Sequence, residues 1–331
     1  MEVPTRLLSL TFHGWTLVQA LQHPAACMSR TVDCLELWAG VGSVAHAARN
    51  MGFKSIAVDK LDCPDGACTE LYDITSRKGF ERAMTYVLSV VVGGLLVMAP
   101  CCSSFGFLNL SKTKRSVNNP EGDISYNKVQ DGNSQAMAAA FLFALASIRS
   151  VKAVVENPTS SWLFKLPVWR LLSDVFSLKY TNVARCYFDT AQHGKRMLKI
   201  YKFAGLQWSC SLRAKCNCPG RKHIKLTRKY TVNNKMKTSG IGKQLKQSQV
   251  YPKKLGEWIV KHWKASQRQD ARTILPDHRG RMPGCQKCTP VQDNIARGLG
   301  LKSWKTKGAH SGASRGQSSS STGLGFRSWK A

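Results

Sequence analysis

Short apolar runs alternate with segments of helical periodicity over the first half of the chain. Five runs are typical of buried strands that end in turns: 33–38, 55–58, 71–74, 95–99 and 153–155. Three segments between them are typical of helices: 43–51, 76–88 and 134–148. Strands that alternate with helices pair in parallel under two helical layers. The pattern therefore predicts an α/β fold with a Rossmann-like, doubly wound, mostly parallel sheet.

The strand and helix pattern weakens beyond Asp189. A strand is predicted at 199–203 and a helix at 252–264. From Gly308 onwards Ser and Gly dominate, a composition that does not support a packed core. The chain is therefore divided into four parts: an N-terminal extension (1–30), an α/β domain (31–189), a small basic second domain that ends in the helix (190–265) and a basic, largely disordered tail (266–331).

One long uncharged stretch, residues 83–111, is a candidate for a membrane span. Gly93 and Gly94 interrupt this stretch, and Pro100 lies within it. A helix followed by a buried parallel strand accounts for the same residues. We therefore expect no membrane segment here.

Positive charge is concentrated in the second half of the chain. The net charge is +30; residues 1–189 hold 18 Lys and Arg against 15 Asp and Glu, whereas residues 190–331 hold 31 against 4. A polycationic half indicates a polyanionic partner, because lysines and arginines that face phosphates release condensed counterions on binding. We therefore expect nucleic acid as the partner. A solvated basic tail and an anionic membrane surface are the alternatives.

The 12 cysteines are irregularly spaced, and the N-terminal residues do not have the features of a secretory signal. This pattern favours a reducing, intracellular compartment over a disulfide scaffold, and the nucleus if the organism is eukaryotic. An organellar destination stays open, because the first thirty residues contain a single acid, Glu2, together with Arg6 and Arg30.

Three of the predicted strands are followed by residues that can carry out chemistry. Gly40 and Gly42 follow the first run, Cys101 follows the fourth, and Glu156 follows the fifth. The carboxyl ends of parallel strands meet at one edge of the sheet, where open α/β folds bind ligands. A glycine loop, a cysteine and a glutamate would then share one cleft. Each residue alone has a plain structural interpretation as a tight turn, a small core residue or a loop cap.

The combination resembles the DNA cytosine-5 methyltransferase family. The family's first loop, Asp-Leu-Phe-x-Gly-x-Gly, corresponds here to residues 36–42, its Pro-Cys to 100–101 and its Glu-Asn to 156–157. The resemblance implies that Cys101 is a nucleophile that adds to cytosine C6, and that Glu156 hydrogen-bonds to or protonates the N3 side of the base. It implies S-adenosylmethionine as the cofactor, held by Trp38, Gly40, Gly42, Asp59, Asp73 and Pro100.

The two aspartates also suit this cofactor by their positions. Asp59, at the end of the second predicted strand, suits ribose hydroxyls, and Asp73, at the end of the third, suits the adenine amino group. The third glycine of a dinucleotide-binding loop is absent after Ser43. This favours S-adenosylmethionine over a nicotinamide cofactor, so an oxidoreductase is a weaker interpretation.

Several segments depart from the family pattern. Cys102 and Pro158 stand where the family has Gln and Val, and the family's Gln-x-Arg-x-Arg segment falls on 192–196. Only Arg196 of its two arginines is retained, as the third candidate catalytic residue. The closing Gly-Asn-Ser-Val segment is not found, and Tyr251 followed by proline is a plausible replacement. These departures leave open a catalytically inactive protein that keeps the fold and binds nucleic acid. For an active enzyme, DNA is favoured over RNA as the substrate.

A second group of reactive residues lies in the basic half. Cys210, Cys216, Cys218 and His223 offer four soft ligands within fourteen residues, enough to close a tetrahedral zinc site. Their spacing matches no standard zinc finger, so incidental thiols in a loop are the alternative. Basic and aromatic residues are interleaved around them, as expected for a phosphate-binding surface with stacking groups.

Overall fold

The structure is a computed structural model that describes residues 30–60, 70–189, 195–218 and 223–274. Most of the predicted N-terminal extension and most of the predicted tail lie outside these residues.

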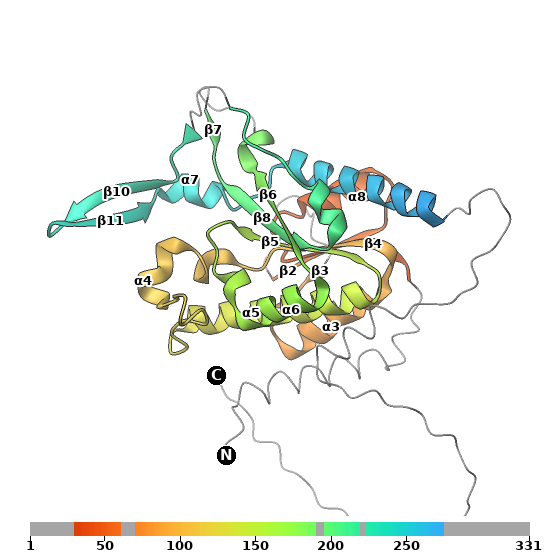
Figure 1. Cartoon of the computed structure of the whole chain (residues 1–331), viewed down its shortest axis with the longest axis horizontal. Helices are drawn as coiled ribbons and strands as arrows, with labels where there is room; N and C mark the ends of the chain where they lie inside the picture. Colours follow the sequence, from red (N-terminus) through yellow and green to blue (C-terminus); the bar gives the residue numbers. More distant parts are fainter. Residues whose placement is uncertain (1–29, 61–69, 190–194, 219–222, 275–331) are drawn as a thin grey trace, which may run out of the picture.

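A seven-stranded sheet forms the centre of the described part (Figure 1). Its strand order is β3-β2-β1-β4-β5-β8-β6; the strands from β3 to β5 pair in parallel, and β8 is antiparallel to both of its neighbours. The strands are β1 (Val32–Leu37), β2 (Ser55–Asp59), β3 (Glu70–Leu71), β4 (Val90–Met98), β5 (Lys152–Pro158), β6 (Lys179–Ala184) and β8 (Ile200–Gly205). The predicted Rossmann-like α/β fold is confirmed.

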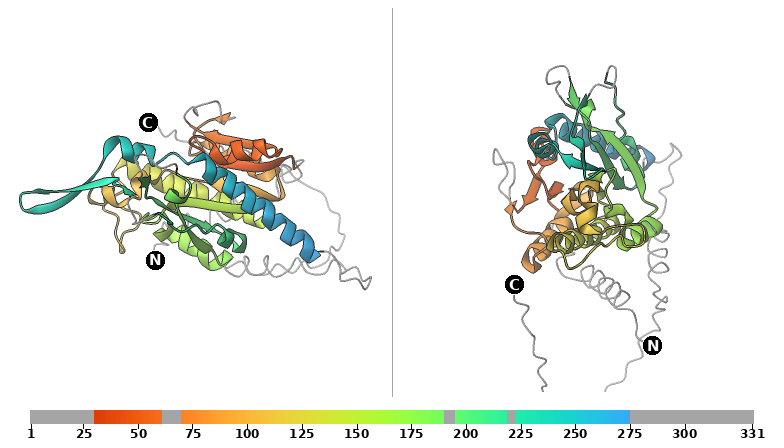
Figure 2. Two further views of the ribbon diagram at one scale, coloured as in Figure 1. Left: turned by 90° about the horizontal axis from the view of Figure 1, so that it is seen from above. Right: turned by 90° about the vertical axis from the view of Figure 1, so that its left-hand side faces the viewer.

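Helices cover both faces of this sheet. The helices α3, α5 and α6 lie on one face, and α2 and α8 lie on the other (Figure 1 and Figure 2). Leu96 and Met98 of β4 pack into the first core, and Leu95 and Val97 pack into the second, the alternation of a strand buried on both faces. The helices are α2 (Ser43–Asn50), α3 (Arg77–Ser89), α5 (Asn127–Ile148), α6 (Pro167–Phe176) and α8 (Lys253–Ile274), with the short α4 (Leu110–Thr113) and α7 (Gly242–Gln247).

The strand β4 is longer than the strand predicted at 95–99, because the glycine pair lies within it. Gly93 has a φ of +72°, and the register between β1 and β4 shifts between Val32 and Cys34. The glycines therefore form an irregularity in a continuous strand rather than a break. No helix within the described ranges is long and apolar enough to cross a membrane.

The chain beyond Asp189 contributes to the same sheet. The strand β8 lies between β5 and β6, and α8 packs across α2 on the second face. A Cβ atom at Gly256 of α8 would lie 2.3 Å from the carbonyl oxygen of Ser43. This close contact between the two helices therefore needs a glycine at position 256.

Two small ladders lie outside the main sheet. The strands β7 (Arg196–Met197) and β9 (His223–Ile224) pair in parallel, and β10 (Thr227–Val232) and β11 (Lys235–Gly240) form an antiparallel hairpin. Asn233 and Asn234 at its tip have φ values of 49° and 55°, as a two-residue hairpin turn with the native twist requires. The hairpin extends away from the body of the protein (Figure 1).

Candidate active site

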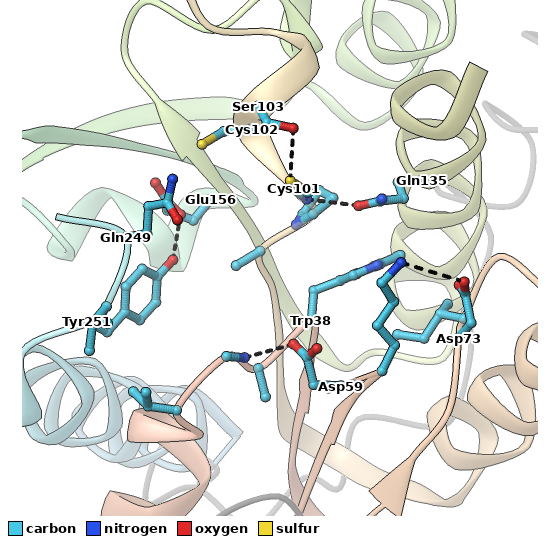
Figure 3. Close-up of a pocket in the computed structure, with 18 of the residues that line it drawn as sticks. Trp38, Asp59, Asp73, Cys101, Cys102, Ser103, Gln135, Glu156, Gln249 and Tyr251 are labelled. Carbon is cyan, nitrogen blue, oxygen red and sulfur yellow. Dashed lines mark hydrogen bonds and ion pairs between the residues drawn. The ribbon is translucent and has the colours of Figure 1, made fainter. Parts of the chain in front are cut away.

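A cavity of about 460 Å³ opens at the carboxyl edge of the parallel strands. Figure 3 shows residues from the loop after β1, from β2 and β5, and from the loop after β4 around it, with Tyr251 from the segment before α8. Of the residues assigned to catalysis or cofactor binding from the sequence, seven line this cavity: Trp38, Gly40, Asp59, Asp73, Pro100, Cys101 and Glu156. Gly42 and Arg196 do not.

The loop after β1 is held in an unusual backbone conformation. Trp38, Gly40 and Gly42 all have positive φ, at 52°, 58° and 62°. The amide of Gly40 donates to Oδ2 of Asp59 at 2.9 Å, which joins this loop to the end of β2. The φ of Gly40 is one that residues with a side chain rarely adopt, and a Cβ atom there would meet nothing within 4 Å, so a ligand has space to approach on this side of the loop. Gly42 caps the start of α2.

Glu36 forms a buried contact beneath this loop. Its Oε2 accepts hydrogen bonds from the amides of Val44 at 3.1 Å and Ala45 at 2.8 Å, in the first turn of α2. Burial raises the pKa of Glu36 from 4.5 to about 7, and the two amides act in the opposite direction. The sequence pattern gives Glu36 as a conservative departure from aspartate but does not reveal this capping role, because the contact needs the strand-to-helix turn to be known.

Asp73 is fixed by the turn that precedes α3. Its Oδ1 accepts from the amide of Thr75 at 2.9 Å and from the Thr75 hydroxyl at 2.6 Å. The hydroxyl contact, followed in strength by the amide and by Lys60, holds the pKa of this carboxyl below its usual value. Asp73 therefore faces the cavity as an anion with a defined orientation.

Cys101 follows β4 at the mouth of the cavity. Its amide donates to Oε1 of Gln135 at 2.8 Å, and its thiol donates to Oγ of Ser103 at 3.2 Å (Figure 3). Asn157 donates from Nδ2 to the carbonyl oxygen of Pro100 at 2.9 Å, which ties this loop to β5. The thiol of Cys101 is exposed. At the neighbouring Cys102, burial raises the pKa to about 11, which keeps that thiol protonated.

Glu156 is buried at the inner end of the cavity. Its Oε2 accepts a 2.5 Å hydrogen bond from the hydroxyl of Tyr251 (Figure 3). Its other oxygen, Oε1, is buried without a hydrogen-bond partner among the described residues. Burial raises the pKa of Glu156, against the opposing effects of Lys199 and of the Tyr251 hydroxyl. Burial therefore shifts this carboxyl group towards its protonated form, and Oε1 can hydrogen-bond to a ligand.

Lys199, rather than Arg196, is the cation beside Glu156. Arg196 lies on β7, and its Nη1 donates to the carbonyl oxygen of Cys186 at 3.3 Å. Lys199 lines the cavity, and its Nζ donates to the carbonyl oxygen of Ser248 at 3.2 Å. The sequence places Lys199 at the start of a predicted strand, but the antiparallel pairing with β5 that brings this start to the cavity is not a local signal.

The zinc ligands expected from the sequence need one correction. The group that the structure brings together is Cys186, Cys216, Cys218 and His223, whose ligand atoms all lie within 4.8 Å of one another. Cys210 is exposed in a separate short 3-10 helix, 207–211, and does not belong to this group. The chain reverses between Cys210 and Cys216. Ala214 bridges to Val183, and this bridge brings Cys216 and Cys218 to the end of β6, close to Cys186.

Comparisons with protein-family models and with curated proteins give no significant match. The function is therefore inferred from the residues of this site.

Proposed function

We propose that this protein transfers a methyl group from S-adenosylmethionine to C5 of cytosine in a polynucleotide, with DNA favoured over RNA. One observation carries the proposal. The exposed thiol of Cys101 and the buried carboxyl of Glu156, with one unpaired oxygen, line the same cavity as the Gly40 loop and Asp59. These would serve as a nucleophile, a proton donor and a cofactor loop in one place.

The cofactor would lie along the β1 to β3 end of the cavity. The open backbone at Gly40 allows close approach, and the carboxylate of Asp59 suits ribose hydroxyls. Asp73, at the edge beyond β3, suits an amino group of the adenine. When bound, S-adenosylmethionine would supply an electrophilic methyl group, and its sulfur would leave as a neutral thioether.

Cys101 and Glu156 would activate the base together. A cytosine ring is a weak nucleophile at C5 until another group adds to C6. The thiol of Cys101 first loses its proton to solvent, and the thiolate sulfur then forms a bond to C6 while Glu156 gives its proton to N3, which makes the ring an enamine that is nucleophilic at C5. After C5 has accepted the methyl group, a base removes the C5 proton. Release of the thiolate from C6 and return of the N3 proton to Glu156 then restore the aromatic ring.

The raised pKa of Glu156 supports this role, because burial shifts the carboxyl group towards the protonated form that can donate. The target cytosine would have to leave the base stack of the polynucleotide to reach the cavity.

The β10–β11 hairpin supports a polynucleotide as the partner. Arg228 lies opposite Ser239 and Tyr230 lies opposite Lys237 in the ladder. Residues directly opposite share a face, and positions two apart along a strand also share it, so Arg228, Tyr230 and Lys237 lie on one face. Two cations beside an aromatic ring suit a phosphate backbone with an unstacked base.

Two observations favour a second candidate, a non-catalytic protein that binds the same ligands. Arg196 does not line the cavity, and Tyr251 already occupies one oxygen of Glu156. The cavity of such a protein would recognise the base without forming a covalent bond to it.

A covalent trap distinguishes the two candidates. The full chain is incubated with S-adenosylmethionine and with DNA or RNA that contains 5-fluorocytosine, in which fluorine replaces the proton that must leave. We expect a stable protein–nucleic acid adduct with the wild type, none with Cys101→Ser, and an adduct with the matched control Cys102→Ser. If the wild type binds both ligands and forms no adduct with either polymer, the non-catalytic candidate is the better one.

A further inference from the structure

We propose that Cys186, Cys216, Cys218 and His223 bind one zinc ion, and that this ion anchors the root of the β10–β11 hairpin to the central sheet. The site lies outside the candidate active-site cavity, and its metal binding does not depend on the methyltransferase proposal.

The four ligand atoms have the spacing of a closed tetrahedral site. Sγ of Cys216 and Nε2 of His223 are 3.3 Å apart, and all four atoms lie within 4.8 Å of one another. With zinc–sulfur bonds of about 2.3 Å, tetrahedral neighbours would be about 3.8 Å apart. Small side-chain movements would therefore close the group around one ion.

The donor set favours zinc over harder cations. Three thiols and one imidazole form a Cys3His set, which is typical of structural zinc sites. All three cysteines are free thiols. Calcium and magnesium require oxygen ligands, and the group contains none.

Of the four ligands, Cys186 lies beside the buried Arg185, whereas Cys216, Cys218 and His223 lie in segments that have little other support. Cys186 lies in a short 3-10 helix, 185–187, directly after β6, and the amide of Ala184 donates to Ala214 at 2.8 Å. His223 opens β9, which pairs with β7 over two residues each. Ladders this short contribute little stability alone. A structural metal supplies what a small apolar core does not.

Arg196 fits the charge of such a site. Zinc with three thiolates and a neutral imidazole carries a net charge of −1. Arg196 lies opposite His223 in the β7–β9 ladder, and its Nη1 donates to the carbonyl oxygen of Cys186. The guanidinium group is therefore placed to offset the excess negative charge.

The proposed zinc site also lies next to the contacts that hold Val250, which lines the candidate active-site cavity together with Tyr251. Arg185, next to Cys186, is buried and donates to the hydroxyl of Tyr201 at 3.0 Å and to the carbonyl oxygens of Ser248 and Val250. Val250 precedes Tyr251. An ion bound to His223 would hold the chain before the hairpin. The same ion bound to Cys186 would hold the neighbouring Arg185, which contacts the chain after the hairpin at Ser248 and Val250.

Metal analysis of the full chain tests the proposal. We expect the purified wild type to contain one zinc ion per chain, and cobalt exchanged for zinc to give the intense visible bands of tetrahedral coordination together with thiolate-to-cobalt bands. Cys186→Ser and His223→Ala should lose the ion. The matched control Cys210→Ser should keep it, because Cys210 lies outside the group.

A ligand-preserving variant covers the case in which the loss variants fail to fold. His223→Cys should retain one ion and show stronger thiolate-to-cobalt absorption, as expected for a fourth sulfur ligand. The proposal is overturned if the wild type binds neither zinc nor tetrahedral cobalt. It is also overturned if the ion is lost in Cys210→Ser but kept in Cys186→Ser.

The anchoring role has its own readout. Removal of the ion by a chelator should increase proteolytic cleavage between β9 and β11, whatever ligand the hairpin binds. A metal-free protein that resists cleavage there as well as the zinc form would contradict anchoring while leaving metal binding intact.

Discussion

Tyr251 and Glu156, 95 positions apart in the sequence, form a 2.5 Å hydrogen bond from the phenol to Oε2 of the carboxyl group. Glu156 is buried and Tyr251 is partly buried beside the cavity, and desolvation, followed by the charge of Glu156, raises the pKa of Tyr251 well above 10.0. The phenol therefore stays protonated and keeps donating. Through this bond the segment before α8 lowers the pKa of a carboxyl group on β5, against the larger effect of burial.

Replacing Tyr251 with Phe should move the titration of Glu156 to higher pH. The Tyr251 hydrogen bond lowers the pKa of Glu156 against the effect of burial, so its removal raises that pKa further. A carboxyl pKa raised by folding contributes stability at low pH that is lost as pH rises through the folded value. The pH at which this loss ends should therefore increase in Tyr251→Phe, as measured by chemical unfolding over a pH series.

The same substitution should cost about 1–3 kcal/mol of unfolding free energy near neutral pH, because a buried oxygen of Glu156 loses its partner. Tyr180→Phe is the control, because the Tyr180 side chain is exposed. An identical pH profile for Tyr251→Phe and the wild type would contradict the coupling. If the protein is active, the pH profile of adduct formation should shift in the same direction.

Glu36→Gln should remove a pH-dependent contribution to the free energy of unfolding while keeping the cap of α2. Burial raises the pKa of Glu36 from 4.5 to about 7, so wild-type stability should fall as pH rises between these values, by up to about 3 kcal/mol. A Gln carbonyl can accept from the amides of Val44 and Ala45 but does not titrate. Unfolding free energies measured from about pH 4.5 to 8 should therefore fall less steeply with pH in Glu36→Gln than in the wild type.

Glu36→Ala is the companion variant. It leaves both amides without their acceptor, so it should be less stable than Glu36→Gln at every pH. Parallel pH profiles for the wild type and Glu36→Gln would show that Glu36 keeps an ordinary pKa.

The parallel half of the fold could be predicted from the sequence because its signals are local. Each buried strand there is an apolar run that ends in a turn, and parallel pairing then places Cys101 and Glu156 at one edge without further information. Strand and helix ends were less predictable. The glycines in β4 look like a break in the sequence but are accommodated by a shift in register.

Contacts between distant segments could not be read from the sequence in the same way. Cys186 takes the place expected for Cys210 because Ala214 bridges to Val183, a pairing between segments about thirty residues apart. Lys199 reaches the cavity only because β8 inserts antiparallel between β5 and β6. Both placements depend on topology, whereas the periodicity of a segment reports only on its own neighbours.

Asp59→Asn should weaken S-adenosylmethionine binding about tenfold or more, because the charged acceptor for ribose hydroxyls becomes a neutral amide. The amide oxygen can still accept from Gly40, so the loop should keep its conformation. Calorimetry with the full chain measures the change. Asp33→Asn is the matched control, because Asp33 caps the amide of Lys54 and does not line the cavity. Tight binding of NADH in place of S-adenosylmethionine would contradict the cofactor assignment.

Charge and base stacking at the β10–β11 hairpin should contribute to polynucleotide binding in ways that can be measured separately. If the basic half contacts some six to ten phosphates, wild-type affinity for a polynucleotide should fall by about 10³ or more between about 50 and 200 mM salt. Replacing both Arg228 and Lys237 with Gln should reduce the slope of log K against log salt by about 2, at about 0.9 per lost phosphate contact. Tyr230→Ala should instead cost about 1–3 kcal/mol of binding with the slope unchanged, because stacking does not release ions.

Two exposed lysines on α3 and α5 provide the matched control for the lost charges. Lys78→Gln with Lys128→Gln removes the same net charge from a part of the protein away from the hairpin, so the salt slope should stay close to that of the wild type. Fluorescence anisotropy over a salt series, on single- and double-stranded DNA and RNA, measures all four proteins. An equal change of slope in both double variants would mean that total charge, not the hairpin face, determines binding. A wild-type affinity that is flat across the salt range would contradict a phosphate interface altogether.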